Sequence, residues 1–350
     1  MRRTSALIVG GGPAGAAAAI TLARGGAMPV LIERCPGERD VVCGGFLGWD
    51  ALAALKRLGL DAAALGARPI HRLRLVSGGR IVEAALPKAA AGLSRRRLDA
   101  ALLGMAEKAG AAVLRGRTAR ALDGHRLRLD GDEEMEADAL FLATGKHELR
   151  GAARETGDRP VSVGLRAALP PMPDLAGVIE LHLFDGGYAG LLSQEDGATN
   201  LCLTVTRDRM TDRDALITAL IEESPMLGER IGASLPAHWE AVAGVPYGWR
   251  ARSTEPGRYR LGDQAAVIAS IAGDGIAIAL ASGAAAAHAC LAGESAEAFQ
   301  RGFAQRSARP IRIAEMLRHF AARSGRRSLM MGLAGVPGLA KAAARLTRID

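Results

Sequence analysis

Aromatic side chains, paired cysteines and long apolar runs are all scarce in this chain of 350 residues. Six Phe, three Tyr and three Trp make up 3% of the sequence. No run of eighteen apolar residues occurs, so no segment is predicted to span a membrane. The four cysteines include no CxxC pair, which argues against both a zinc site and a disulfide framework; they are Cys35, Cys43, Cys202 and Cys290.

Two further absences narrow the function. The first residues, Met1 to Ser5, lead straight into a predicted strand and leave no room for the apolar segment of a signal peptide. With the cysteine usage, this predicts a protein of the reducing cytoplasm. No Ser-His-Asp, metal-ligand or paired-carboxylate grouping stands out, so we expect no metal, and the catalytic groups stay unknown. Chemistry carried by an organic cofactor would need none of these groupings.

The net charge of +8 is unevenly distributed along the chain. Residues 301–350 contain eleven Arg or Lys and two acids, whereas the remaining residues are close to neutral. Such a segment is typical of a solvated helical face, of a contact with an anionic membrane, or of a site for a cofactor phosphate. Nucleic acid is excluded as a partner, because no nucleic-acid-binding module accompanies the charge.

Small and apolar residues, by contrast, are abundant. Apolar residues make up 49% of the chain, and Ala and Gly allow helices to pack close to a sheet. Thr4–Val9, Pro13–Arg24 and Pro29–Glu33 read as strand, helix and strand, which is a βαβ unit. Further helices are expected at Trp49–Leu58 and at Ser94–Ala109, the latter with Ser94 as N-cap.

The rest of the chain alternates between short strands and helices. A hairpin is predicted from Arg72–Val76 and Arg80–Leu86, and a meander from Thr118–Leu122, Arg126–Leu129 and Glu134–Ala137, followed by an apolar segment at Asp138–Ala143. A mostly antiparallel sheet is predicted from Val161–Leu169, Val178–Phe184, Tyr188–Leu192 and Asn200–Thr206. The final predicted elements are a helix at Asp212–Glu223 with Thr211 as N-cap, a strand at Arg258–Leu261, a helix at Gly275–Cys290, and two or three basic helices broken near Pro310 and Pro337.

The first motif is Gly10-Gly11-Gly12-Pro13-Ala14-Gly15, placed between a strand and a helix. Gly10 permits the tight turn, Gly12 lets the backbone approach a pyrophosphate, and Gly15 lets the helix pack on the strand. Glu33 ends the second strand, where a carboxylate can accept ribose hydroxyls. The motif predicts a dinucleotide, and it does not separate NAD from FAD.

The second motif separates the two cofactors. Gly262-Asp263 ends a strand about 250 residues later, and Gly273-Asp274-Gly275 opens a helix just beyond it. An Asp at a strand end can hold a ribityl or ribose hydroxyl, and a glycine-rich helix N-terminus can stabilise the negative charge of a reduced flavin. A plain NAD-dependent dehydrogenase would leave Gly262–Ala279 unexplained, so FAD is the predicted cofactor.

These motifs, with Ser94–Asp99 and Ala143-Thr144-Gly145 between them, occur in an order that resembles the para-hydroxybenzoate hydroxylase superfamily of flavoproteins. Cys43-Gly44-Gly45 resembles a loop of the geranylgeranyl reductase branch. The resemblance covers about residues 4–290. It implies an α/β chain with an FAD-binding Rossmann-like fold of the glutathione-reductase type, an inserted antiparallel β-sheet substrate domain and C-terminal helices.

The resemblance also implies domain boundaries. Residues 1–70, 90–150 and 256–300 would form a discontinuous FAD-binding domain. Residues 71–89 and 151–255 would form the substrate domain. Residues 301–350 lie beyond the resemblance, and their own charge and pattern predict a basic helical segment that allows peripheral membrane contact. The oligomeric state is left open.

The residues expected at the cofactor follow from the same match. Glu33 would reach the adenosine ribose, Asp263 the ribityl and pyrophosphate region, and Cys43 would border the flavin ring. Which of Arg95, Arg96 and Arg97 matches the family's arginine is open. The full set is Gly10, Gly12, Pro13, Ala14, Gly15, Glu33, Arg34, Cys43, Gly44, Arg95, Thr144, Gly145, Asp263, Gly273, Gly275 and Ile276.

The sequence departs from the family pattern at two places. A proline that is usual near Ala269-Ser270 is absent. At Gly186–Leu191, geranylgeranyl reductases carry an aromatic-rich stretch, of which this chain keeps only Tyr188. Cys43 and Tyr188 are the candidates that line the cavity at the reacting centre. Trp249, Tyr247 and His182 could line it as well, although packing is the favoured role for each of these three.

Three functions remain open at this point. The first is an NAD(P)H-dependent monooxygenase that hydroxylates or epoxidises a small apolar or aromatic metabolite, with NAD(P)H binding transiently because no second GxGxxG follows a strand. The second is a reductase of carbon–carbon double bonds. The third is a carrier without redox chemistry, as in the Rab GDP dissociation inhibitors, which the intact Gly and Asp motifs disfavour. The missing aromatic stretch favours the first, and the Cys43-Gly44-Gly45 loop favours the second.

Overall fold

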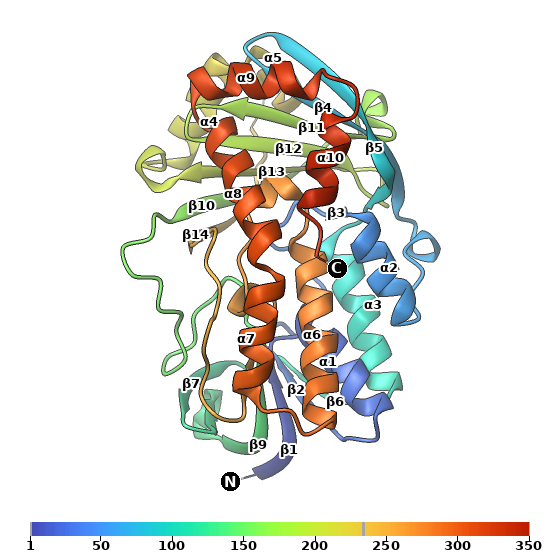
Figure 1. The fold of residues 1–350 in the computed structure, drawn as a ribbon, viewed down its shortest axis with the longest axis vertical. Coiled ribbons are helices and arrows are strands. Elements are labelled where there is room, and N and C mark those ends of the chain that lie inside the picture. Colours follow the sequence, from blue (N-terminus) through green and yellow to red (C-terminus); the bar gives the residue numbers. More distant parts are fainter. Residues whose placement is uncertain (1, 233–234, 350) are drawn as a thin grey trace.

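The computed structural model describes residues 2–232 and 235–349, and its strands form two sheets at opposite ends of the molecule (Figure 1). In spatial order the first sheet contains β6 (Ala112–Arg115), β2 (Val30–Glu33), β1 (Arg2–Val9), β9 (Glu134–Leu142), β8 (Arg126–Leu129) and β7 (Ala119–Asp123). β15 (Arg258–Arg260) pairs with β9 in parallel. The predicted βαβ unit is confirmed, since β1 pairs in parallel with β2.

β9 is longer than predicted. Its first residues pair antiparallel with β8, and its last residues pair in parallel with β15. The sequence suggested a strand ending at Ala137 and a separate apolar segment. The structure joins them because Met135 to Leu142 lie beside β1 in continuous parallel register.

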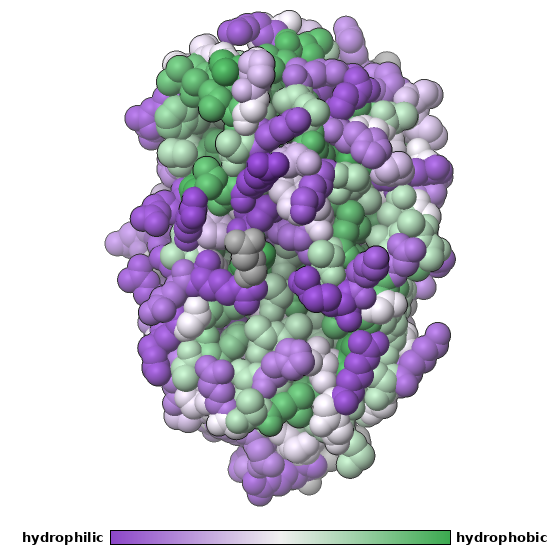
Figure 2. Space-filling view, turned by 45° about the vertical axis from the view of Figure 1, so that its right-hand side comes forward, coloured by the Kyte–Doolittle hydropathy of each residue, from purple (hydrophilic) through white to green (hydrophobic). Residues whose placement is uncertain are grey.

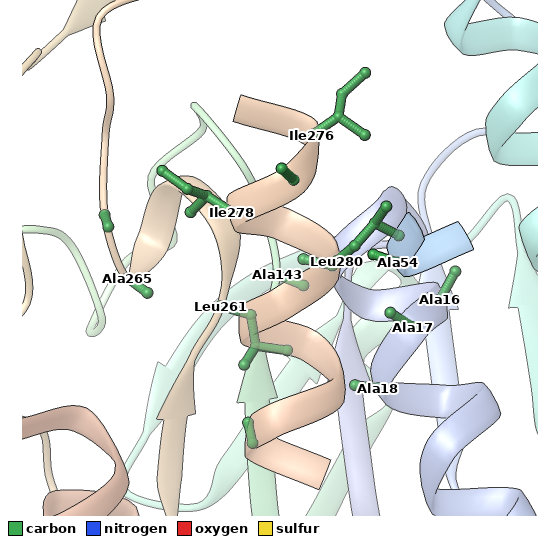
Figure 3. Close-up of a cluster of buried hydrophobic side chains, with 14 of the residues drawn as sticks. Ala16, Ala17, Ala18, Ala54, Ala143, Leu261, Ala265, Ile276, Ile278 and Leu280 are labelled. Carbon is green, nitrogen blue, oxygen red and sulfur yellow. The ribbon is translucent and has the colours of Figure 1, made fainter. Parts of the chain in front are cut away.

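Three helices cover one face of the first sheet. α1 (Pro13–Arg24), α3 (Arg95–Lys108) and α6 (Gly275–Leu291) pack on side chains such as Ile8 and Phe141. Figure 3 shows that α1 contributes Ala16, Ala17 and Ala18 to this core, while Leu280 comes from α6. α1 and α6 cross so closely that a Cβ on Gly283 would lie 2.1 Å from the carbonyl oxygen of Ala14.

The second sheet has the order β14 (Glu240–Val245), β10 (Ser162–Leu169), β13 (Thr199–Thr206), β12 (Gly187–Ser193), β11 (Val178–Phe184), β4 (Arg68–Ser77), β5 (Arg80–Gly92) and β3 (Phe46–Leu47). Its pairs are antiparallel except β11 with β4. Neither β3 nor β14 was predicted. β4 and β5 belong to this sheet although they precede most of the first sheet in the sequence.

α4 (Arg213–Glu223) and α5 (Pro225–Ile231) pack on one face of the second sheet. Side chains along β12 alternate between that core and the other face: Ala189 and Leu191 point to the helices, whereas Tyr188 points away. The N-cap of α4 is Asp212, whose carboxylate accepts from the Ala215 N–H. Thr211 as N-cap was therefore wrong, because the helix begins one residue later than the sequence suggested.

The C-terminal region forms four helices instead of two or three: α7 (Ala296–Arg306), α8 (Ala308–Ala321), α9 (Ser324–Ala334) and α10 (Leu339–Leu346). Figure 1 shows α8 running from the first sheet toward the second, with α9 and α10 beside the second sheet. α2 (Trp49–Arg57) lies near the junction of the two halves. The predicted α/β fold with an antiparallel sheet and C-terminal helices is confirmed. No described helix meets the length and hydropathy needed to cross a bilayer.

Candidate functional site

A cavity of about 1030 Å³ brings the two sequence motifs together. It is lined by loops of the first sheet, by one face of the second sheet and by α8 to α10. Of the residues predicted to contact FAD, all except Gly15 line this cavity, and Tyr188 lines it as well. Segments about 250 residues apart in sequence therefore share one site.

The first glycine loop fits a pyrophosphate because its backbone leaves no room for side chains. Gly10 has a φ of +107°, and a Cβ there would lie 2.3 Å from the carbonyl oxygen of Ala143. A Cβ on Gly15 would lie 1.9 Å from the carbonyl oxygen of Gly10. Gly12 is the N-cap of α1 and makes no side-chain cap, so the first N–H groups of the helix remain available to an anion.

Arg95 is the arginine of its basic run that faces this loop. A Cβ on Gly12 would lie 3.2 Å from its Nη2, whereas Arg96 and Arg97 are exposed. Arg95 donates to Asp99 through Nε and Nη2, at 2.8 Å and 2.7 Å. Burial raises the pKa of Asp99 even though the guanidinium acts to lower it. Asp99 therefore holds the guanidinium of Arg95 beside the N-terminus of α1.

Glu33 is held by the backbone on both carboxylate oxygens. Its Oε2 accepts from the Gly11 N–H at 2.7 Å, and its Oε1 accepts from the Cys35 N–H at 2.8 Å. Each carboxylate oxygen retains a further acceptor position. Since Glu33 also lines the cavity, its carboxylate can still accept hydrogen bonds from the hydroxyl groups of a ribose.

The second motif contacts the first directly. Gly262 has a φ of +55°, and a Cβ there would lie 3.2 Å from the Cβ of Ala14. Next to it, the Asp263 carboxylate lies 3.2 Å from the Lys146 ammonium. Asp263 raises the pKa of Lys146, although burial acts against it. Lys146 was not predicted, and its place directly after Thr144-Gly145 is the signal that could have found it.

The loop before α6 is built from glycine and an anchored aspartate. Gly273 has a φ of +69°, and a Cβ there would lie 2.7 Å from the Phe46 ring. Asp274 is the N-cap of α6 but makes no side-chain cap, because its carboxylate accepts from Arg348 Nη1 at 2.5 Å and from the Ile349 N–H at 3.2 Å. The first N–H groups of α6 are therefore open toward the cavity.

Arg348 is the main link between the C-terminal segment and this loop. Besides Asp274, it donates to the carbonyl oxygen of Ala272 at 3.1 Å, and its guanidinium carbon lies 4.4 Å from the centre of the Trp49 ring. Asp274 is fully buried and Arg348 is 9% exposed. Burial raises the pKa of Asp274, although Arg348 acts to lower it. Neither side chain was assigned a role from the sequence.

The second sheet holds the Cys43 loop in place. Asn200 of β13 donates from Nδ2 to the carbonyl oxygens of Cys43 and Gly44, at 3.1 Å and 2.9 Å. Arg166 of β10 in turn donates to Oδ1 of Asn200 at 2.7 Å. Asn200 and Arg166 carry no sequence motif, so only the paired strands could reveal their role.

Four hydroxyl groups meet where the second sheet approaches the loop before α6. Ser270 Oγ is hydrogen-bonded to the hydroxyl of Tyr188 and, at 2.9 Å, to that of Tyr247. Tyr247 also donates to Thr204 Oγ1 at 3.4 Å. Burial raises the pKa of both tyrosines, so they are neutral donors. All four residues line the cavity, and we call them the hydroxyl cluster.

Four hydroxyl protons serve three hydrogen bonds within this cluster, so one proton is left to donate elsewhere. Cys202, on the same strand as Thr204, lines the cavity nearby. Burial raises the pKa of Cys202 to about 12, which keeps it a thiol. The cluster is thus a neutral donor site in an otherwise largely apolar wall.

Trp249 and His182 do not line the cavity. Trp249 is buried and donates from Nε1 to the carbonyl oxygen of Glu155 at 3.0 Å. His182 is fully buried and hydrogen-bonded to Glu180 at 2.8 Å. Both therefore have packing roles, which is the role that the sequence favoured. Within residues 2–232 and 235–349, no group of three His, Cys, Asp or Glu could hold a metal ion.

Comparisons with known proteins support the cofactor assignment. Residues 3–150 match the model of the FAD binding domain family. A menaquinone reductase of Mycobacterium tuberculosis is 28% identical over 304 residues, which cover 79% of this chain and 74% of the relative. The first 150 residues thus contain an FAD-binding domain.

Two solved structures have a similar fold. A geranylgeranyl bacteriochlorophyll reductase-like protein from Thermoplasma acidophilum aligns with a TM-score of 0.80 at 19% identity, covering 99% of this chain and 97% of that one. PqsL of Pseudomonas aeruginosa, described as "a probable FAD-dependent monooxygenase", aligns with a TM-score of 0.70 at 17% identity, covering 98% of this chain and all of that one. At these identities the likeness establishes the fold alone.

Proposed function

We propose that this chain, an FAD-dependent oxidoreductase of the para-hydroxybenzoate hydroxylase-like superfamily, reduces a carbon–carbon double bond in a small apolar substrate that carries an oxygen-bearing ring. The observation that carries the proposal is the continuity of one cavity from the two glycine loops, past the hydroxyl cluster, to the apolar walls of α8 to α10. A ring oxygen would accept from the hydroxyl cluster, and an apolar chain would lie against the helices.

The residues at the cavity fit FAD. The open N-terminus of α1 and the charge of Arg95 would hold the pyrophosphate, Glu33 the adenosine ribose, and Asp263 with Lys146 the ribityl side. The open N-terminus of α6, next to Gly273, would face the flavin ring together with the Cys43 loop. In this proposal residues 1–70, 90–150 and 256–300 bind FAD, and residues 71–89 and 151–255 bind the substrate.

When bound, FAD supplies two-electron chemistry after reduction by NAD(P)H, which we propose binds transiently. The chain itself positions the substrate and excludes water. In the hydroxyl cluster Tyr247 donates to Thr204, so the Thr204 hydroxyl has the proton that would be donated to the substrate oxygen. The Asn200 amide fixes the Cys43 loop against the cavity, and the apolar side chains of α8 to α10 keep the substrate chain out of water.

We rank double-bond reduction above hydroxylation or epoxidation, whereas the sequence alone favoured the monooxygenase. Support for reduction comes from the curated relative, a menaquinone reductase, because menaquinone combines an oxygen-bearing ring with an isoprenoid chain. The Cys43 loop, which resembles that of reductases, borders the cavity. Hydroxylation or epoxidation of an aromatic or apolar metabolite stays the second candidate, because the chain lacks the aromatic stretch of the geranylgeranyl reductases and because the fold also matches a monooxygenase.

Anaerobic turnover separates the two candidates. With NADPH and a short-chain menaquinone, we expect a product formed without oxygen that stays two hydrogens heavier after its ring has been reoxidised to the quinone. Turnover that requires oxygen and places labelled oxygen in the product would transfer the assignment to the monooxygenase. A colourless purified protein that binds no FAD would contradict both reactions and restore the carrier hypothesis.

A matched pair of variants tests the cofactor site itself. Arg95→Met removes the charge beside Gly12, and we expect the fraction of protein that retains FAD to fall at least about tenfold, since a charge-assisted contact is worth about 1.5–3 kcal/mol. Arg97→Met removes an exposed arginine from the same helical turn. It should retain FAD as the unchanged protein does; equal losses in both variants would contradict the assignment of Arg95.

The C-terminal helices line the cavity, but the proposed reaction does not require them to contact a membrane. The four cysteines are all unpaired, which suits the reducing cytoplasm as the proposed location.

A further inference from the structure

Exposed apolar side chains gather on the C-terminal helices. Nine large apolar residues of the described chain are exposed, and six of them lie between residues 316 and 346: Met316, Leu329, Leu333, Val336, Leu339 and Leu346. Figure 2 shows hydrophobic residues beside strongly hydrophilic ones at the upper end of the molecule, where Figure 1 places α9. The three helices α8, α9 and α10 contact one another, and such a grouping of exposed apolar residues is typical of an interaction surface.

The same segment carries positive charge without any negative charge. Residues 316–349 contain no Asp or Glu. Arg318 pairs with Glu315, Arg327 with Asp185, and Arg348 with Asp274. Four exposed cations of this segment, Arg323, Arg326, Lys341 and Arg345, make no ion pair with any described residue. Their charge is therefore available to an anionic partner.

The exposed apolar surface continues into the cavity. Met316, Leu333 and Leu339 are 52%, 45% and 45% exposed, and each also lines the cavity. They come from α8, α9 and α10 respectively. These three helices therefore form an apolar opening. Of the four unpaired cations, Arg323 is the N-cap of α9, and Lys341 and Arg345 belong to α10.

We propose that the face formed by α9 and α10 docks on an anionic lipid bilayer, and that an apolar substrate passes from the bilayer between α8, α9 and α10 into the cavity. The docking surface consists of Arg323, Leu329, Val336, Lys341, Arg345 and Leu346. Apolar side chains beside basic ones are the pattern by which interfacial helices bind anionic membranes. The passage of substrate rests on the proposed function, whereas the docking does not.

A bilayer fits this surface better than a second copy of the chain does. A second copy would bring the same four unpaired cations against each other, which is repulsive. A protein partner would have to cover an apolar opening that leads into a cavity. The hydrocarbon interior of a bilayer would instead meet this opening with the same apolar surroundings that the proposed substrate prefers.

Sedimentation of the full chain with lipid vesicles tests the docking. We expect binding to vesicles with about 30% phosphatidylglycerol to be at least about tenfold tighter than to pure phosphatidylcholine vesicles. The double variant Arg323→Glu/Arg345→Glu should lose at least about tenfold in binding to the anionic vesicles. The double variant Leu329→Ser/Val336→Ser should lose about tenfold, and neither residue lines the cavity.

The controls change the same chemistry elsewhere. Arg120→Glu/Arg128→Glu reverses two exposed charges on β7 and β8, at the opposite end of the molecule (Figure 1). Met28→Ser removes an apolar side chain that is 80% exposed. Both should bind the vesicles as the unchanged chain does. Equal binding to neutral and anionic vesicles, or equal losses in the controls, would overturn the proposal, as would a dimer that the Leu329→Ser/Val336→Ser variant abolishes.

Vesicle binding is measured without turnover, so its outcome is independent of the reaction. A chain that binds anionic vesicles but holds no FAD would contradict the proposed function and leave the docking intact. A chain that reduces menaquinone in detergent but does not bind anionic vesicles would contradict the docking and leave the proposed function intact.

Discussion

The two ends of the cavity are built by opposite rules. At the glycine loops, Cβ atoms on Gly10 and Gly15 would come within 2.3 Å and 1.9 Å of carbonyl oxygens, so the backbone admits one residue type. At the far end, Met316, Leu333 and Leu339 face both the cavity and the solvent. A cofactor of fixed shape requires a fixed backbone, whereas an apolar chain requires only apolar volume. This difference explains why the cofactor can be read from the sequence more easily than the substrate.

Arg348 joins the two ends, and its loss should have the largest effect. Arg348→Met would leave the buried carboxylate of Asp274 without its partner, which costs about 3–5 kcal/mol of unfolding free energy. Thermal unfolding at pH 8 checks this expectation. The exposed pair of Arg3 with Asp138 provides the control, and Arg3→Met should leave the midpoint unchanged. A small change in Arg348→Met would mean that the two ends are not coupled.

The same variant should depend on pH in a defined direction. Burial raises the pKa of Asp274, so ionisation of this carboxylate weakens the folded state as the pH rises from the unfolded pKa toward the folded one. Removal of Arg348 raises the folded pKa further. The loss of unfolding free energy in Arg348→Met, relative to the unchanged chain, should therefore be smaller at pH 5 than at pH 8. A loss that is larger at pH 5 would contradict this account.

Gly15→Ala tests the rigid end. The new Cβ would overlap the Gly10 carbonyl oxygen, and overpacking of this kind costs about 1–3 kcal/mol. We expect a lower unfolding midpoint and loss of retained FAD. In Gly104→Ala, the Cβ meets nothing within 4 Å on α3, and the change should stabilise the chain by about 0.5–1 kcal/mol. Similar unfolding midpoints for Gly15→Ala and Gly104→Ala would show that the glycine loop tolerates a side chain as well as α3 does at Gly104.

Tyr247→Phe probes the middle of the cavity. It removes one hydroxyl and two hydrogen bonds of the hydroxyl cluster, with an expected cost of about 0.5–1.5 kcal/mol in unfolding free energy. Without the Tyr247 hydroxyl, the hydroxyls of Thr204 and Ser270 lose the partner that orients them, so binding of a phenol, followed through the flavin absorbance, should weaken, while binding of benzene should not. Tyr259→Phe is the control. Tyr259 is buried, does not line the cavity, and donates a hydrogen bond of 2.7 Å to the carbonyl oxygen of Glu294.

Leu333→Met should have the smallest effect on stability. Leu333 is 45% exposed, and a swap between Leu and Met nearly conserves volume, so the unfolding free energy should change by less than about 0.5 kcal/mol. The preference between short-chain and long-chain substrates should change instead, as competition assays can measure. A large loss of stability would show that the apolar wall is as constrained as the glycine loops.

Local elements were largely predictable from the sequence because local rules decide them. α1 has the predicted bounds, and Ser94 caps α3 as expected by accepting from the Arg97 N–H at 3.1 Å. Glycine turns, caps and alternation act within a few residues, so they can be recognised in the sequence. The same rules placed the N-cap of α4 one residue too early, at Thr211, because two adjacent residues were both able to cap.

What the sequence by itself determined is the pair of glycine motifs and, through them, the FAD-binding fold. The tertiary structure alone decided that Arg95 faces Gly12, that Asn200 holds the Cys43 loop, and that Arg348 anchors Asp274 from 74 residues away. The reason is physical: a positive φ or a helix cap is dictated by neighbours along the chain, whereas an ion pair or a shared hydroxyl depends on which surfaces pack, and packing is decided by the whole core.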